Sequence, residues 1–376
     1  MNKIIVNTLE LLDTAGKIGM IADKKSIISF NMMKKQQGDK VYYAVTVTAF
    51  DGKTQIASNL FAKGAEVDGD QINFTLGYEV VGVINAVSRE GTETTVLEIN
   101  SNSVTVISGS SSVTLALKSE GIAPVVFDLY NRDMIEGYYE LNTAEFKDAI
   151  ERVSVAVDNN PEARCPGICL SPMDNGTLIL RSLNGICMAQ SICVTVNEQV
   201  KNRTVFSTLS RLLKSVISTV SGDTVKVYKT TSHMVIQSKM QLWQLPLLDN
   251  SVSREAFDKI LSGVRPVVVN IKKDLLINAV AVVQAAAQDD MSVLVYMNEG
   301  KIAVSSPTKS ARTIIAPDNM TGELQETALN VQYLKTVLGI VKGNEVVIKY
   351  KDATSAMSIS EKGNDKAVAI IAPLCH

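Results

Sequence analysis

Cysteine and histidine are the side chains of this sequence best suited to bind a metal or to act as nucleophiles, and the chain has five cysteines and two histidines. One of each lies at its end, as Cys375 and His376, directly after the apolar run AIIAPL. A thiolate beside an imidazole can bind zinc or attack a carbonyl. The same two residues are equally compatible with the end of a strand, so the surrounding elements must decide between these readings.

The remaining candidates do not form a recognisable reactive site. Cys165-x3-Cys169 and Cys187-x5-Cys193 lack the spacing of common zinc sites and have no histidine nearby, which favours buried free thiols. No glycine-rich phosphate-binding loop is present. His233 is expected in a turn or strand, and the adjacent carboxylates of Asp289 and Asp290 in a turn after a helix. The sequence therefore predicts no enzyme activity, no metal and no cofactor.

Composition narrows the class of protein further. A chain of 376 residues, 46% of them apolar and 20% charged, is expected to fold into two or three domains. The net charge of −2 does not by itself indicate a nucleic-acid partner, which would require a local basic patch. No apolar run is long enough to span a membrane, and the N-terminus is a poor signal peptide. We expect a cytoplasmic protein with reduced thiols.

Internal repeats organise the chain. The segment VNTLELLDTAGKIGMIAD from Val6 aligns without gaps with LNTAEFKDAIERVSVAVD from Leu141, and a third copy starts at Val269. A second set pairs LLKSVISTVSGDTVKVY from Leu212 with YLKTVLGIVKGNEVVIKY from Tyr333, and has a looser copy from Tyr78. The second set reads as a helix, a tight turn and a strand. The prediction is an α+β protein of three repeated domains, 1–133, 134–262 and 263–376, each with two helices and antiparallel sheets.

In the order and spacing of these segments the chain resembles the bacterial DNA polymerase III beta subunit, the DNA sliding clamp. The resemblance rests on the triplication, on TLILRSLNGICMAQS after the second copy, on ALNVQYLKTVLGIVKGNEVVIKY, and on the ending APLCH. It implies a homodimeric closed ring with helices inside and sheets outside. Such a ring would encircle duplex DNA without sequence specificity and tether the replicative polymerase, the clamp loader and other partners, near the nucleoid at replication sites.

The resemblance also implies a mildly basic lining that meets phosphates without reading bases. The alternative is that each basic residue is simply a solvated side chain on an amphipathic helix. The predicted DNA-contacting residues are Lys17, Lys24, Lys25, Arg89, Lys147, Arg152, Arg211, Lys214, Lys272, Lys273, Lys335 and Lys342.

Partners of this family bind by short linear motifs in an apolar pocket between the second and third domains. Carried over by alignment, the pocket consists of Pro166, Leu183, Gly185, Ile186, Cys187, Met188, Lys259, Ile260, Asn330, Tyr333, Thr354, Ala356, Ile370, Ile371, Ala372, Pro373 and Leu374. The alternative is that these are core residues of two strands and a helix. Relatives usually have His and Arg at Ile186 and Cys187, which suggests a divergent or phage-encoded member with a less basic pocket.

The dimer interface implied by the resemblance joins Val113 and Leu115 of the first domain to Ala285 and Ala286 of the third. Val113 is small where relatives often have a large aromatic residue. Two other classes of function stay open from the residues. One is a β-rich, ring-shaped interaction scaffold that does not encircle DNA, and the other is a metal-dependent hydrolase with an unrecognised site.

Overall fold

The computed structural model describes residues 2–37, 39–88, 91–119, 135–158, 167–249, 252–286 and 291–374. The chain forms two compact units, of which the first contains residues 1–138 and 215–246 and the second contains residues 139–214 and 247–376. The chain passes between the units three times, within strand β9 (Ile135–Asn142), within helix α4 (Ser210–Thr219) and after strand β16 (Gln241–Pro246). This grouping into two units does not test the predicted division into three domains, which stays a prediction.

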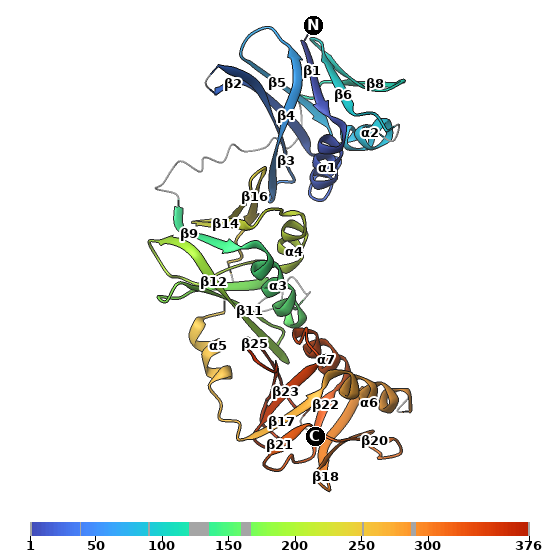
Figure 1. The fold of residues 1–376 in the computed structure, drawn as a ribbon, viewed down its shortest axis with the longest axis vertical. Helices are drawn as coiled ribbons and strands as arrows, with labels where there is room; N and C mark the ends of the chain where they lie inside the picture. The colour runs from blue at the N-terminus through green and yellow to red at the C-terminus, as the bar shows by residue number, and fades with distance from the viewer. Residues whose placement is uncertain are drawn as a thin grey trace. The chain divides into compact units, whose positions relative to one another are not determined.

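The first unit is built around the long strand β4 (Gln55–Glu66), which is drawn in blue in Figure 1. One edge of β4 pairs with β3, while the other edge pairs first with β16 and then with β1. The elements of this unit are β1 (Asn2–Asn7), α1 (Thr8–Ile18), β2 (Ile27–Gln37), β3 (Lys40–Phe50), β5 (Gln71–Gly77), α2 (Glu79–Val87), β6 (Thr94–Ile99), β7 (Ser103–Ser108), β8 (Ser111–Ala116), β14 (Thr224–Thr230), β15 (His233–Gln237) and β16 (Gln241–Pro246).

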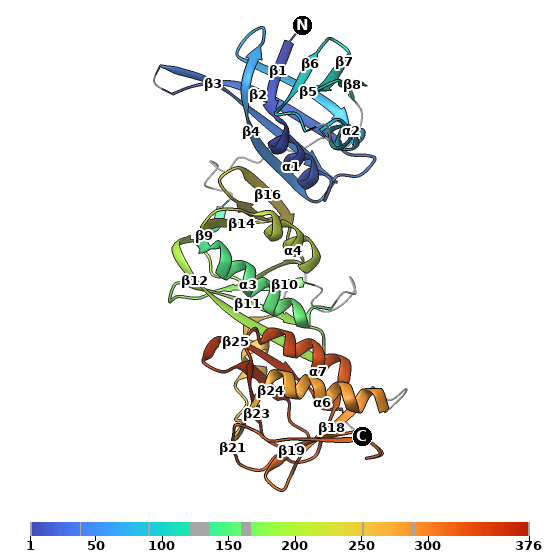
Figure 2. The same cartoon turned by 45° about the vertical axis from the view of Figure 1, so that its right-hand side comes forward.

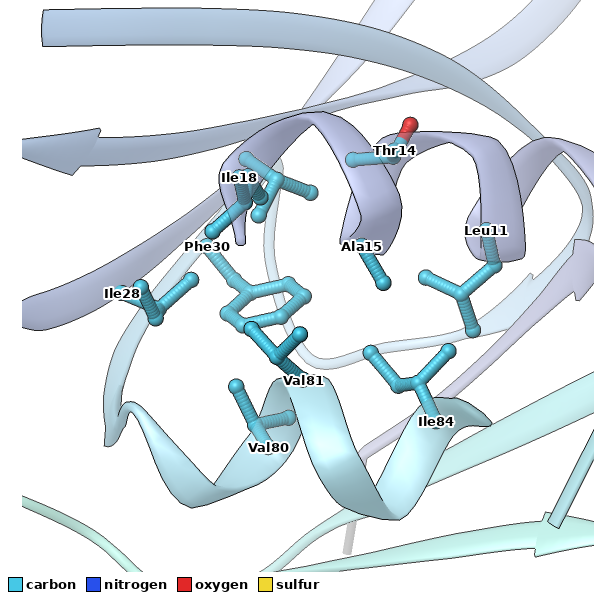
Figure 3. Close-up of a pocket in the computed structure, with 10 residues that line it drawn as sticks. Leu11, Thr14, Ala15, Ile18, Ile28, Phe30, Val80, Val81 and Ile84 are labelled. Atoms are coloured by element: carbon cyan, nitrogen blue, oxygen red, sulfur yellow. The ribbon is translucent and has the colours of Figure 1, made fainter. Parts of the chain in front are cut away.

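The two helices of the first unit cover one face of its sheet, and Figure 3 shows their contact. Leu11, Ala15 and Ile18 of α1 face Val80, Val81 and Ile84 of α2 above Phe30, whose ring stacks on Phe74 with centroids 4.8 Å apart. The gap that remains is about 10 Å³, which is too small for a ligand. This interior is therefore a packed core. The single tryptophan, Trp243 on β16, is 1% exposed and lies opposite Ile56 of β4.

The second unit contains one long antiparallel sheet in the order β13, β10, β11, β12, β25, β24, β23, β17, β21, and a separate sheet in the order β20, β19, β18, β22. The strands are β10 (Gly167–Pro172), β11 (Thr177–Leu183), β12 (Cys187–Val200), β13 (Phe206–Leu209), β17 (Val267–Lys272), β18 (Ser292–Asn298), β19 (Lys301–Ser305), β20 (Arg312–Ile315), β21 (Asn319–Thr321), β22 (Thr327–Asn330), β23 (Glu345–Tyr350), β24 (Met357–Glu361) and β25 (Asn364–Ile371).

Helices of the second unit lie beside these sheets, and Figure 2 shows α6 and α7 side by side. They are α3 (Thr143–Val153), η2 (Ser154–Ala156), α5 (Arg254–Leu261), α6 (Lys273–Ala286), α7 (Val331–Val337) and η3 (Leu338–Ile340). β9 (Ile135–Asn142) and α4 (Ser210–Thr219) complete the element order. No helix in the described ranges is both long and apolar enough to cross a membrane.

Local sequence explains where these elements start and turn. The asparagines that precede the repeated helices are N-caps, because Oδ1 of Asn7, Asn142 and Asn330 accepts backbone N–H groups at the start of α1, α3 and α7. Asn175-Gly176 and Glu299-Gly300 form hairpin turns, with positive φ at both glycines. The mixed architecture of helices and antiparallel sheets is thus confirmed.

Candidate partner-binding cleft and basic surface

An apolar cluster lies within the second unit, at the place where β12 pairs with β25. Its buried members are Cys169 of β10, Met188 of β12, Phe257 of α5 and Ile370 of β25. Met188 and Ile370 are direct partners in the antiparallel ladder, so two segments almost 200 residues apart in sequence share one apolar surface. Half-buried hydrophobic residues pack around this centre, and they are Leu183, Val205, Val252, Ile260, Leu261, Ala356 and Val368. We call this packed set of side chains the α5 cleft, because it is the candidate site for a partner segment.

Helix α5 is held against the sheet by two arginines that the sequence did not single out. Arg181, which is 3% exposed, lies 5.3 Å from the centre of the Phe257 ring and forms an ion pair of 2.5 Å with Asp258. At the other end, Arg265 donates to the carbonyl oxygens of Ile260 and Leu261 at 3.1 and 3.2 Å. Burial lowers the pKa of Arg265 from its ordinary value. These contacts fix the position of α5.

The structure brings together five of the predicted pocket residues in the α5 cleft, namely Leu183, Met188, Ile260, Ala356 and Ile370. Cys187 and Ile371 are their neighbours along the same two strands and are also buried. Because side chains alternate along a strand, these two residues belong to the opposite face of the sheet. Burial raises the pKa of Cys187 to about 12, so its thiol is protonated at neutral pH.

The chain beyond β25 is held by backbone hydrogen bonds to the turn before β12 and to strand β22. Ala372 donates to the carbonyl oxygen of Ile186 at 2.9 Å, and Leu374 donates to that of Ala328 at 2.8 Å. Gly185, with φ of 86°, forms the turn next to Ile186. Ala372, Pro373 and Leu374 are half-buried. Ala372 therefore lies beside the turn between β11 and β12, and the role of these three residues in a pocket stays a prediction.

Other predicted pocket residues have structural or peripheral positions. Asn330 caps α7 and accepts the backbone N–H of half-buried Tyr333 at 3.2 Å. Thr354 is exposed and donates to Asp352 at 2.9 Å, and Lys259 is exposed on α5. Pro166, Cys165, Arg89, Asp289, Asp290, Cys375 and His376 lie outside the described residues.

Sequence reasoning missed the residue at the centre of the cleft, Phe257, and the partners Cys169, Val205 and Val252. A signal was available for Phe257. Ser253 is an N-cap, and Phe257, Ile260 and Leu261 follow at the spacing of one helical face. The six expected helices came from the internal repeats, and α5 belongs to none of them.

The predicted DNA-contacting residues divide into paired and exposed groups. Arg152 is only 6% exposed, and its guanidinium forms ion pairs with Asp148 at 2.6 Å and Glu361 at 2.9 Å. It also donates to the carbonyl oxygen of Ile340. Lys17 is 9% exposed and pairs with Asp13 one helical turn earlier. These contacts give Arg152 a structural role, and a direct role of either residue at DNA stays untested.

A second group surrounds a carboxylate of α3. Nζ of Lys342 lies 2.8 Å from Glu151, and Lys214 contributes a further favourable charge. The hydrogen bond from Lys342 is the main reason that the pKa of Glu151 is lowered. Lys214 and Lys342 are both exposed, so this group presents more positive than negative charge to solvent.

The remaining basic residues vary in exposure. Lys24 and Lys25 are exposed in the turn after α1, Arg211 on α4 and Lys272 at the end of β17. Lys147 is half-buried on α3. Lys273 donates to the carbonyl oxygen of Val341 at 2.6 Å, and Lys335 donates to Gln284. In the described ranges no group of three or more His, Cys, Asp or Glu residues could hold a metal ion.

Each unit also has an edge strand with exposed apolar residues. In the first unit β8 pairs only with β7 among the described strands, and Val113 on it is 36% exposed beside half-buried Leu115. In the second unit β20 is at the end of the four-stranded sheet, with Ile314 48% exposed. Ala285 and Ala286 are exposed at the end of α6.

Comparisons with known proteins agree with this architecture. Residues 265–375 match the model of the family described as DNA polymerase III beta subunit, C-terminal domain. A search of curated proteins found no match.

Solved structures match over the length of the chain. The DNA polymerase III beta chain from Streptococcus pneumoniae has a TM-score of 0.82 at 16% identity, with all of both chains covered. A sliding clamp from Pseudomonas aeruginosa bound to griselimycin has a TM-score of 0.84 at 15% identity, again with both chains fully covered. The Helicobacter pylori beta clamp bound to a DNA ligase peptide has a TM-score of 0.79 at 14% identity, covering 99% of this chain and 100% of the other. Residues 265–375 therefore match the family model of the DNA polymerase III beta subunit, C-terminal domain, and the whole chain has the fold of the bacterial beta sliding clamps.

Proposed function

We propose that this protein is a DNA sliding clamp, a non-catalytic processivity factor that encircles duplex DNA and tethers a replicative polymerase. The observation that carries the proposal is the full-length match to beta clamp structures combined with the family match of residues 265–375. The proposal includes three clamp domains, 1–133, 134–262 and 263–376, and an action at replication sites in the cytoplasm.

Two copies would close the ring through the edge strands of the two units. The edge of β8 with Val113 and Leu115 would meet the domain of a second copy that contains β20, Ala285 and Ala286. Closure would remove unpaired strand edges that otherwise invite uncontrolled association. A two-fold arrangement repeats the same contact twice, and so closes without further copies.

A closed ring needs little affinity for DNA, because topology prevents escape. Exposed Lys24, Lys25, Arg211, Lys214 and Lys272 are suited to non-specific phosphate contacts. Lys342 can contribute alongside Lys214, since together they exceed the charge of Glu151. Arg152 is better suited to hold α3 in place.

The α5 cleft is the proposed site for polymerase, clamp loader and other partners that carry short linear motifs. Its half-buried aliphatic residues can accept aliphatic or aromatic anchors of a peptide, and Met188 adds an adaptable side chain beneath them. The similar clamp from Helicobacter pylori is described as bound to a DNA ligase peptide, which supports a peptide as the ligand class.

The test is retention on DNA of different topology. The purified full-length chain is incubated at high concentration with nicked circular plasmid and, separately, with the same plasmid after linearisation, and both are passed over a sizing column in high salt. Retention on the circle and loss from the linear form is the expected result, because only a closed circle prevents a ring from sliding off. A restriction cut after loading should release the protein.

Equal loss from circular and linear plasmid would contradict the clamp proposal and favour a scaffold that does not encircle DNA. Equal retention on both would also contradict it, because binding would then depend on affinity. A variant with Val113 and Ile314 both changed to Glu is the matched control, since it keeps the basic residues and should lose retention on the circle.

A further inference from the structure

A groove lies on the first unit, on the face of its sheet that α1 and α2 do not cover. Its volume is about 310 Å³, which is within the range of ligand-binding pockets. It is lined by Met33, Lys35, Tyr42, Ala44, Thr46, Asn59, Phe61, Lys239 and Met240. The first seven come from alternate positions of β2, β3 and β4, while Ile28, Phe30 and Met32 of β2 are buried on the helix side.

The floor of the groove is apolar and partly exposed. Met33, Ala44 and Phe61 lie in one row across the three strands, because Met33 pairs with Ala44 and Ala44 pairs with Phe61. Met33 is 40% and Phe61 51% exposed. The small side chain of Ala44 between two large ones creates the hollow. Tyr42 packs edge-on against Phe61, with ring centroids 5.9 Å apart.

The groove is formed by the regular ladder and so needs no rearrangement to accept a ligand. Thr46 donates to Asn59 at 2.8 Å across the strands, and the backbone N–H of Asn59 donates to the carbonyl oxygen of Met240 at 2.8 Å. The second contact fixes the turn that carries Lys239 and Met240 against β4. A preformed site loses less conformational entropy on binding.

The charges at the groove are of one sign. Lys35 and Lys239 line it and are both exposed, whereas no carboxylate is among its lining residues. Lys35 lies opposite Tyr42 in the β2–β3 ladder, one row beyond Met33, and Lys239 precedes Met240. Two cations beside an aromatic and methionine floor complement a ligand that has both apolar side chains and carboxylates.

We propose that this groove docks a short acidic segment of a partner protein, with one or two apolar side chains placed over Ala44 between Met33 and Phe61. Carboxylates of the segment would pair with Lys35 and Lys239. The segment would bind through side chains alone, because β2 and β3 are already paired on both edges and cannot accept a further strand. This site shares no residue with the α5 cleft, and the inference does not depend on the clamp proposal.

The test uses the full-length chain with methyl-labelled methionine, followed by NMR during titration with a defined probe. The probe is a peptide with two aspartates on each side of a Leu-Phe centre, and the comparison peptide has lysine at every aspartate. The expected result is that the methyl signals of Met33 and Met240 shift with the acidic peptide and not with the basic one, while the signal of Met188 stays unchanged.

Three variants complete the experiment. Ala44→Ile fills the hollow with a residue that favours strands, and should abolish the shifts. Lys35→Glu combined with Lys239→Glu should weaken binding by about tenfold or more. Lys301→Glu with Lys349→Glu is the control of equal charge change at two exposed lysines of the second unit, and should leave the affinity within about twofold.

Shifts confined to Met188, equal binding of both peptides, or equal affinity of the groove and control variants would each overturn the proposal. So would cross-links from a photoreactive group at position 33 that reach only this chain or a second copy of it when a lysate of the cells that produce the protein is added.

Discussion

At the scale of single residues, the contacts of Arg152 show how the environment changes the meaning of a basic side chain. From sequence it is one of several cations on amphipathic helices. In the fold its guanidinium joins α3 to Glu361 of β24 and to the carbonyl oxygen of Ile340 in η3, more than 180 residues away. A buried cation that contacts two carboxylates and a carbonyl oxygen holds together the elements that carry these groups.

Replacing Arg152 with Ala should therefore destabilise the second unit. The change leaves Glu361, whose side chain is 19% exposed, without its cation, and we expect a loss of about 2–4 kcal/mol. Differential scanning calorimetry measures the effect. Lys342→Ala is the control, because its pair with Glu151 has side chains 43% and 61% exposed and should contribute less than about 1 kcal/mol. Similar losses in both variants would contradict the structural role of Arg152.

The ion pair between Arg152 and Glu361 should make the stability of the protein depend on pH. Burial would raise the pKa of Glu361, but hydrogen bonds from Arg152 and from the Lys342 backbone outweigh it, so the pKa is below the ordinary 4.5. A carboxyl with a lowered folded pKa stabilises the protein above its unfolded pKa, and this contribution is lost as the pH falls through the folded pKa.

Glu361→Gln should therefore lower the melting temperature near about pH 7 and flatten its decline toward about pH 4. Thermal unfolding followed by circular dichroism at several pH values would show this. A variant whose melting temperature falls with acid as steeply as that of the wild type would exclude Glu361 as a source of the dependence.

At the scale of elements, the sequence predicted what is local and repeated. The helices after Asn7, Asn142 and Asn330 can be predicted from sequence, because each combines a capping side chain with an apolar face. The pairing of Met188 with Ile370 cannot be predicted from the hydrophobic periodicity of the sequence, because register between distant strands depends on the whole sheet. The family resemblance assigned both residues to one pocket but did not predict their pairing. Helix α5 was missed because it has no copy elsewhere in the chain.

The segment after β25 offers a test of the α5 cleft. Ending the chain at Ala372 removes the hydrogen bond from Leu374 to Ala328 but leaves the β12–β25 ladder intact. We expect an unchanged melting temperature and roughly tenfold weaker binding of motif peptides taken from polymerase tails. Fluorescence anisotropy with a panel of such peptides measures this.

Val196→Ala is the matched control for that truncation, because Val196 is 64% exposed on the same strand β12 and outside the cleft. It should bind the panel like the wild type. If the truncated chain binds every peptide as tightly as the full chain, the segment 373–376 has no part in recognition.

At the scale of the whole molecule, the edges of β8 and β20 require an explanation, because each of these strands pairs on one side only among the described strands. Exposed Ile314 on an edge strand is an aggregation risk unless a partner covers it. A second copy would satisfy this requirement, and ring closure follows if β8 supplies the other edge.

We therefore expect a dimer that dissociates on dilution. Ile314→Glu should raise the protein concentration at which half of the dimer has dissociated by at least about tenfold. Sedimentation velocity over a dilution series measures this. Val194→Glu is the control, since Val194 is 47% exposed on β12, close to the 48% of Ile314. A wild-type chain that stays monomeric at every concentration would rule out the two-copy ring.

The position of Trp243 has a practical consequence for all of these measurements. It is the only indole chromophore of the chain, and it is buried on β16 in the first unit. Its emission should therefore respond to unfolding of that unit alone, whereas circular dichroism reports both. Comparing the two optical signals on one unlabelled sample would show whether the chain melts as a single cooperative block or as two.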